Sequence, residues 1–82
     1  MKRSRQEIIS QILEICINGA SKTKIVYQAN LNFRNAGLYI DSMINSGLLS
    51  IKQENGRKYE TTEKGLRFLH SLNKLRDELP EL

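Results

Sequence analysis

The stretch that most restricts the fold of this chain runs from Ser21 to Gly47, and it is typical of two helices joined by a tight turn. Ser21 is a suitable N-cap for the first helix, because its hydroxyl can accept hydrogen bonds from the opening turn. The segment Asn30-Leu31-Asn32 then interrupts the apolar pattern, since Asn side chains favour turns and caps. Asn32 is a suitable N-cap for the second helix, and Gly47 stands where a left-handed residue commonly ends a helix. A short helix, a tight turn and a longer helix form a helix-turn-helix pattern.

Each helix of this pair has one apolar face. The inward positions of the first helix are Ile25, Val26 and Ala29. In the second helix the apolar residues follow one another at steps of three, four, three and one, which places them on one stripe. These residues are Phe33, Ala36, Ile40, Met43 and Ile44. We therefore predict that both helices pack on a common core.

Another helix is predicted before this pair. Ser4 and Glu7 have the spacing of a capping box, in which the serine accepts from the helix start and the glutamate bonds back to the cap. The predicted helix continues to about Asn18, and Gly19 ends it. Its apolar face includes Cys16, the single cysteine, which excludes an internal disulfide. We expect the thiol to be a small buried side chain.

After the helix-turn-helix, the spacing of the apolar residues is no longer that of a helix. Asn55-Gly56 is a strong hairpin signal, because both residues readily adopt positive φ. We predict antiparallel strands over Leu49–Gln53 and Lys58–Thr61, and a short pairing of Ala20 with a later strand.

A last helix follows the predicted hairpin. Thr62 is a suitable N-cap, and Glu63 then lies near the positive end of the helix dipole, where a negative charge is favourable. Gly65 is unfavourable inside a helix, so we expect it to allow close packing against the rest of the chain. Leu66 and Leu69 are predicted to face that body.

Four apolar residues of this last helix have the spacing of a coiled-coil seam, with steps of four, three and four. They are Phe68, Leu72, Leu75 and Leu79. We predict a homodimer joined through this helix, because one small body does not easily cover apolar positions on so much of its circumference. The alternative is that the four residues pack on their own chain, since the seam is shorter than the three to four heptads that identify a coiled coil.

These elements predict a mainly α protein with a small β-hairpin (α+β), in the order of three helices, two strands and a fourth helix. That order is a winged helix-turn-helix. A chain of 82 residues forms one domain with one small core. We expect residues 1–62 to form the winged helix-turn-helix, and residues 63–82 to form the last helix, packed on the same domain as a dimerisation element.

The charge of the chain is unevenly distributed. Residues 1–58 carry nine Lys or Arg against four acids, whereas residues 59–82 carry four against five. A basic body suits a polyanion, either nucleic acid or an anionic membrane surface. The alternative is charge that serves only solubility, for which the net charge of +4 would suffice.

No apolar run approaches the roughly 18 residues of a membrane span. The basic start is not followed by the apolar core of a signal peptide. We therefore expect a cytoplasmic protein without membrane contacts, associated with the nucleoid if the polyanion is DNA.

Residues 19–49 resemble the winged helix-turn-helix of small archaeal DNA-binding proteins of the 10a type. The shared features are Gly19, Lys-Thr-Lys-Ile at 22–25, Ala-Asn-Leu at 29–31, Phe33 and Gly-Leu-Leu at 47–49. Thr-Thr-Glu-Lys-Gly at 61–65 is similar to the junction between wing and helix in many winged-helix regulators. The resemblance implies binding of double-stranded DNA and a dimer joined by the C-terminal helices.

The second helix of a helix-turn-helix is the usual candidate for the major groove. Arg34 can bind phosphate or the O6 and N7 atoms of guanine, and Asn35 can pair with N6 and N7 of adenine. Asn32 and Tyr39 share this outward face, where the Tyr39 hydroxyl either binds phosphate or covers the edge of the core. The alternative is an ordinary solvated helix face.

Other basic residues are candidates for contacts with the DNA backbone. Lys22 and Lys24 begin the first helix of the pair, which crosses the backbone in this motif. Lys52, Arg57 and Lys58 make the hairpin basic. Charged strands also prevent edge-to-edge aggregation, so the hairpin charges have a second explanation.

The basic start of the chain, with Lys2, Arg3 and Arg5, is either a further flexible contact or a solubilising segment. No motif for a cofactor, a nucleophile with its general base or a phosphate-binding loop is present. His70, the only histidine, has no metal-ligand partner at a suitable spacing. We therefore expect no enzyme activity, no metal and no cofactor.

Two function classes follow from these patterns. The first is a DNA-binding protein, either a transcriptional regulator or an architectural protein of chromatin. The second is a winged helix that binds another protein without contacting DNA. Gly37 and Leu38 stand in the recognition helix where polar or basic residues are usual, and in the second class Leu38 and Tyr39 would contact the partner.

Overall fold

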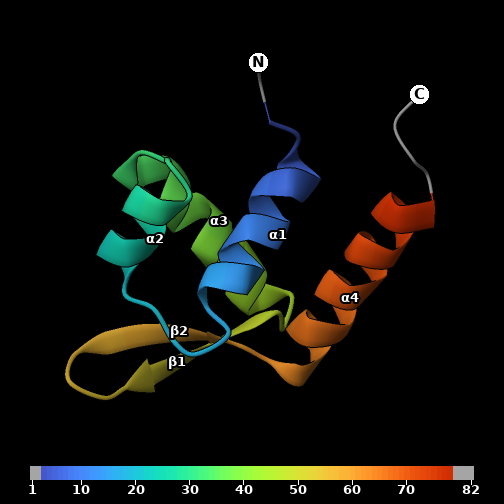
Figure 1. Cartoon of the computed structure of the whole chain (residues 1–82). Coiled ribbons are helices and arrows are strands. Elements are labelled where there is room, and N and C mark those ends of the chain that lie inside the picture. Colours follow the sequence, from blue (N-terminus) through green and yellow to red (C-terminus); the bar gives the residue numbers. More distant parts are fainter. Residues whose placement is uncertain (1–2, 79–82) are drawn as a thin grey trace.

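The computed structural model of the chain describes residues 3–78, which form three helices, an antiparallel hairpin and a fourth helix (Figure 1). The helices are α1 (Arg5–Ile15), α2 (Lys22–Gln28), α3 (Phe33–Asn45) and α4 (Glu63–Glu78). The strands are β1 (Leu49–Gln53) and β2 (Arg57–Thr61). This order confirms the predicted winged helix, and β2 begins one residue earlier than expected. None of the described helices is both long and apolar enough to cross a membrane.

Side-chain caps determine where the first three helices begin, as predicted. The Ser4 hydroxyl accepts from the N–H of Glu7 at 3.1 Å, and the Glu7 carboxylate accepts from the N–H of Ser4 at 3.4 Å. Ser21 caps α2, and Asn32 caps α3 by accepting from the N–H of Asn35 at 2.7 Å. These contacts satisfy backbone donors that the first turn of a helix leaves free.

The turns after α2 and α3 use left-handed residues. Asn30 has a φ of 53°, and the N–H of Leu31 donates to the carbonyl of Val26 at 3.0 Å, which closes the end of α2. Gly47, with a φ of 78°, ends α3 in the same manner. Both ends were predicted from the residue types.

The first helix is shorter than predicted, because α1 ends at Ile15 and not near Asn18. The carbonyl of Cys16 accepts from the N–H of Gly19 at 3.0 Å and from the N–H of Thr61 at 3.0 Å. A contact with β2 therefore replaces the next intrahelical hydrogen bond, and the chain turns out of the helix. Gly19, with a φ of 87°, completes this turn.

The hairpin pairs β1 with β2 and is attached to the helices by one further pairing. Asn55 and Gly56 both have positive φ, at 51° and 99°, as the hairpin signal requires. Ala20 and Tyr59 exchange two backbone hydrogen bonds, of 2.9 and 2.8 Å. The predicted pairing of Ala20 with a later strand is thus confirmed, and it holds the wing against the loop between α1 and α2.

The core is formed by side chains from every helix and from both strands. Its fully buried members include Ile12, Leu13, Cys16, Ile25, Ile40 and Met43. Two residues that were predicted to face the core are exposed instead. Phe33 is 51% exposed, because it is the first residue of α3 and lies at the end of the stripe. Leu66 is 44% exposed, because it lies about 100° around α4 from Gly65, which faces the body.

Gly65 allows α4 to pack closely against the body, as predicted. A Cβ atom there would overlap the carbonyl oxygen of Leu48 and lie 2.8 Å from Cγ2 of Thr61. Thr62 caps α4 by accepting from the N–H of Gly65 at 3.0 Å, and its hydroxyl donates to the carbonyl of Gly47. The start of α4 is therefore joined to the end of α3.

We predict that Gly65→Ala destabilises the fold by about 2 kcal/mol, because overpacking against backbone typically costs 1–3 kcal/mol. This loss exceeds the gain of about 1 kcal/mol that alanine has over glycine within a helix. Urea denaturation followed by circular dichroism measures the difference in the free energy of unfolding.

Gly37→Ala is the matched control, since it makes the same change inside α3. A Cβ atom at Gly37 meets only the end of the flexible Lys22 side chain, with Nζ at 3.1 Å. We expect this variant to be as stable as the parent or up to about 1 kcal/mol more stable. An equal effect of the two substitutions would contradict close packing at Gly65.

Candidate nucleic-acid interface

The outward face of α3 carries the residues predicted to read bases. Asn32, Arg34 and Asn35 are exposed at its N-terminal end, where a recognition helix meets base edges. The side-chain oxygen of Asn32 is engaged as the helix cap, whereas Arg34 has no ion pair among the side chains described, those of residues 3–75. Leu38 lies one turn after Arg34 on the same face and is 60% exposed. The first turn is therefore polar, and the centre of the face is apolar.

Lys22 and Lys24 lie at the start of α2, but they differ in their surroundings. Lys24 is exposed, whereas Lys22 is partly buried. The Lys22 ammonium lies close to the backbone of Gly37, 3.1 Å from the point at which a Cβ atom would be. The glycine in α3 thus leaves room for a lysine of α2, and the structure brings a positive charge beside the recognition helix. Sequence reasoning could not assign this role to Gly37.

Of the three basic residues predicted for the wing, Lys52, Arg57 and Lys58, only Lys52 forms an ion pair within the described residues. Lys52 lies directly opposite Lys58, and its Nζ is 2.8 Å from Oε1 of Glu60. The hydrogen bond and the charge of Glu60 raise the pKa of Lys52 above its usual value. Arg57 and Lys58 have no such partner within the described residues, and they point to opposite faces of the hairpin. The free charge of the wing is therefore concentrated on β2.

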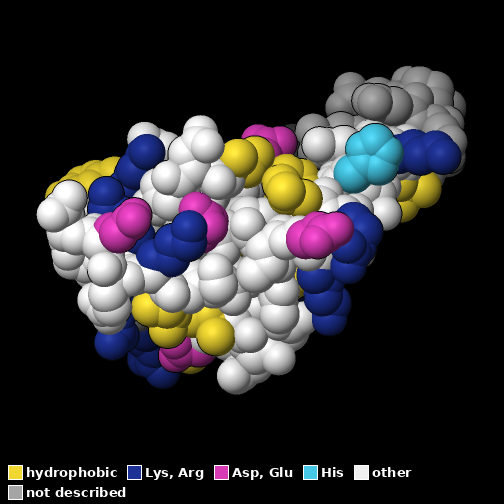
Figure 2. All heavy atoms as spheres, turned by 90° about the horizontal axis from the view of Figure 1, so that it is seen from below, with side chains coloured by type: hydrophobic (Ala, Val, Ile, Leu, Met, Phe, Trp, Pro, Cys, Tyr) yellow, Lys and Arg dark blue, Asp and Glu magenta, His cyan; other side chains and the backbone are white. Residues whose placement is uncertain are grey.

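Charge is mixed on the surface around the wing. Seen from below, Lys and Arg side chains lie among Asp and Glu side chains, with hydrophobic side chains between them (Figure 2). No single continuous basic field is visible on this side of the molecule. Binding of a polyanion would thus depend on particular side chains and not on a uniform potential.

Arg3 is bound to the helix-turn-helix and is not a free cation. Its guanidinium donates to the side chain of Gln11 and to the carbonyls of Ala29 and Asn30, the last at 3.0 Å. These carbonyls lie at the C-terminal end of α2, where a positive charge is favourable. The contacts join residues 26 and 27 positions apart, so no local sequence signal reveals them.

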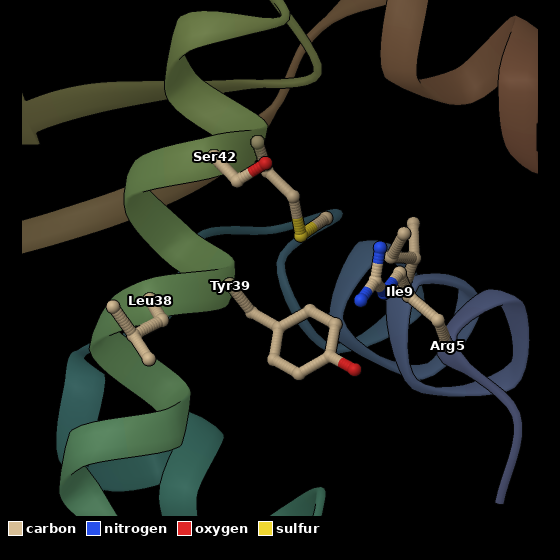
Figure 3. A pocket seen from close by; sticks show the side chains of 6 residues that line it. Arg5, Ile9, Leu38, Tyr39 and Ser42 are labelled. Atoms are coloured by element: carbon tan, nitrogen blue, oxygen red, sulfur yellow. The ribbon is translucent and has the colours of Figure 1, made fainter.

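A pocket of about 270 Å³ lies between α1 and α3, and the sequence did not predict it. Tyr39 extends from α3 toward α1, where Arg5 and Ile9 face it, and Leu38 and Ser42 lie beside it on α3 (Figure 3). Tyr39 is partly buried against the core, which fits the prediction that it covers the core edge.

Helix α4 leaves the body after its first turns and gives the chain a longest dimension of 44 Å (Figure 1). Within the predicted seam, Phe68 and Leu75 are 38% and 52% exposed, and Leu72 is partly buried. Leu79 lies outside the described residues. The described part of the seam is therefore only partly covered by its own chain.

The single cysteine of the chain is buried within the core. Burial raises the pKa of the Cys16 thiol to about 12, so the nucleophilic thiolate is scarce at neutral pH. The described side chains, those of residues 3–75, include no group of three or more His, Cys, Asp or Glu that could hold a metal ion. His70 is exposed on α4.

Comparisons with known proteins agree with this architecture. The family model described as winged helix-turn-helix matches residues 2–79. The crystal structure of Sso10a-2, a DNA-binding protein from Sulfolobus solfataricus, is 36% identical and superimposes with a TM-score of 0.78. That match covers 93% of this chain and 84% of the other. The uncharacterized protein MJ0287 of Methanocaldococcus jannaschii is 43% identical over 75 residues, which are 90% of this chain and 74% of that protein.

A more distant structure shares only the fold. Sco5413, a MarR family transcriptional regulator from Streptomyces coelicolor, is 17% identical and has a TM-score of 0.71. The match covers 85% of this chain and 50% of the regulator. The same arrangement of helices and wing thus occurs in sequences with few residues in common.

We predict that Arg3→Gln lowers the free energy of unfolding by about 1–2 kcal/mol, because it removes charge-assisted hydrogen bonds to the end of α2. Arg5→Gln is the matched control, since Arg5 is exposed and forms no hydrogen bond or ion pair with the described side chains of residues 3–75. We expect it to leave the stability within about 0.5 kcal/mol. Equal stability of the two variants in urea would show that the Arg3 contacts contribute nothing.

Proposed function

The chain belongs to the winged helix-turn-helix family, and on that premise we propose that it binds double-stranded DNA through α3 and the wing. The relative from Sulfolobus solfataricus is described as a DNA-binding protein, and it matches nearly the whole of this chain. The observation that carries the proposal is the free, polar first turn of α3. Arg34 and Asn35 are exposed there, in the position from which a recognition helix contacts base edges.

The contacts that we propose divide into two kinds. Arg34 and Asn35 enter the major groove, where they can pair with guanine and adenine. Asn32 flanks them at the start of the helix, and Tyr39, whose ring covers the edge of the core, borders this face on the side of α1. Apolar Leu38, at the centre of the face, offers only contact with a thymine methyl group. Few side chains are thus available to read sequence.

Phosphate contacts then supply most of the affinity. We assign them to Lys22 and Lys24 of α2 and to Arg57 and Lys58 of the wing. Lys52 would add a fifth, weaker contact, because its ammonium already pairs with Glu60. This balance favours binding with low sequence specificity, as an architectural protein of the nucleoid or as a regulator. We propose a cytoplasmic location and no enzyme activity.

A second candidate function is binding of another protein through the apolar centre of α3. The exposure of Leu38, at 60%, favours it. Leu38→Asp would then abolish partner binding, whereas the loss of basic side chains would have little effect.

We predict that Arg34→Glu combined with Arg57→Glu abolishes binding to an arbitrary labelled duplex in fluorescence anisotropy. In the parent protein, the affinity should fall steeply with salt, because each phosphate contact releases condensed counterions. With four or five contacts, the slope of log K against log salt should be about −4.

The control variant combines Arg67→Glu with Lys74→Glu, which changes the net charge equally but on exposed positions of α4. We expect it to retain most of the affinity. Strong binding by the folded Arg34→Glu, Arg57→Glu protein would overturn the assignment of α3 and the wing. An equal loss in both double variants would indicate that only net charge matters.

We also propose that residues 63–82 join two copies of the chain, each with its winged helix formed by residues 1–62. Phe68, Leu72, Leu75 and Leu79 form the shared seam. Support comes from the exposure of Phe68 and Leu75 on a helix that extends beyond the body. Burial of such side chains against a second copy removes apolar area from water.

Phe68→Lys combined with Leu75→Lys should convert a dimer into a monomer in sedimentation equilibrium, because both exposed members of the seam become charged. The monomer has a mass of 9.5 kDa. Leu66→Lys is the control, since Leu66 is similarly exposed, at 44%, but lies on the other flank of α4. A parent protein of monomer mass at high concentration would refute the dimer.

A further inference from the structure

The pocket between α1 and α3 combines apolar walls with one charged group. Its lining residues are Arg5, Ile9, Leu38, Tyr39, Ser42 and Met43. Four of them contribute apolar surface, and the hydroxyls of Tyr39 and Ser42 are neutral. Arg5 is thus the only charged side chain among the six. Figure 3 shows that the Arg5 guanidinium lies on the side of the pocket opposite α3.

The charge of Arg5 is not compensated by its surroundings. Among the described side chains of residues 3–75, its guanidinium forms no hydrogen bond or ion pair, in contrast to Arg3, which is bound to the end of α2. Across the pocket, Leu38 is 60% exposed. A free guanidinium beside accessible apolar side chains calls for an anion that also has an apolar body.

We propose that this pocket binds a small organic carboxylate with an aromatic or branched aliphatic body. The planar guanidinium matches a carboxylate with two parallel hydrogen bonds. The apolar body would cover Leu38 and Met43 and lie against the ring of Tyr39. The volume of about 270 Å³ is slightly below the usual range of ligand pockets, so the pocket suits a single ring and not a peptide or a dinucleotide.

The position of the pocket implies a consequence for DNA binding, which rests on the function proposed above. Leu38 and Tyr39 belong to the face of α3 that we place at the groove. A ligand in contact with both would cover part of that face. Carboxylate and DNA would therefore exclude one another, and the ligand would act as a negative effector.

Benzoate is a suitable probe, and benzamide is its uncharged counterpart with the same ring. Titration of the ¹⁵N-labelled protein should give saturable amide shifts centred on Arg5, Ile9, Leu38 and Tyr39. For one charged contact and one ring in an open pocket, we expect a Kd of about 1 mM. Benzamide and inorganic phosphate should each bind at least about tenfold more weakly, because each lacks one half of the recognised chemistry.

Two variants test whether Arg5 is the charge that binds the carboxylate. Arg5→Gln should weaken benzoate binding about tenfold, since it removes the charge-assisted pair. Arg34→Gln removes the same charge from a residue of α3 that does not line the pocket, and it should leave the benzoate affinity unchanged. The retained dispersion of the amide spectrum shows that both variants are folded.

The proposal is overturned if benzoate gives no saturable shifts, if Arg5→Gln binds it as well as the parent, or if benzamide binds equally well. It is also overturned if phosphate shifts the same residues with equal affinity, because Arg5 would then be a simple phosphate contact. Displacement of labelled DNA by benzoate, absent in Arg5→Gln, tests the regulatory step separately. A protein that binds benzoate but not DNA would retain this site and refute only the function proposed above.

Discussion

The structure depends on the attachment of β2 to the loop that connects α1 with α2. Ala20 and Tyr59 exchange two backbone hydrogen bonds, and the N–H of Thr61 donates to the carbonyl of Cys16. The Thr61 hydroxyl also donates to the carbonyl of Leu13 at 2.7 Å. These bonds end α1, satisfy buried polar groups and set the direction of the wing relative to the helices. Without them, the hairpin would be a two-stranded ribbon, which is marginally stable alone.

The same attachment determines where α4 begins. Thr62 follows β2 directly, and its hydroxyl links the end of α3 to the first turn of α4. Gly65 then allows the helix backbone to contact the carbonyl of Leu48. Because the start of α4 is held in this way, its later turns leave the body and keep apolar side chains exposed. The geometry that completes the core thus also creates the surface that we propose for dimerisation.

Three sides of helix α3 contact different surroundings, namely the core, the solvent and the pocket. Its buried stripe contributes Ile40 and Met43 to the core, its first turn presents Arg34 to solvent, and its remaining flank borders the pocket through Tyr39. A ligand and a DNA duplex would meet on neighbouring positions of one short helix. Under the two proposals, binding at one site therefore affects the other by direct exclusion, and no conformational change is required.

The sequence by itself determined the local features of this protein. Caps at Ser4 and Asn32 and the Asn55-Gly56 turn were predictable, because each depends on interactions within a few residues.

The tertiary structure decided the features that depend on contacts between distant segments. It ended α1 early, exposed Phe33 and Leu66, and bound Arg3 to the end of α2. It also paired Lys52 with Glu60 and brought Arg5 opposite Tyr39. Residue type shows which side chains carry charge or apolar area. Which of them remain free to bind a partner depends on neighbours far away in the chain, and only the packed structure specifies those neighbours.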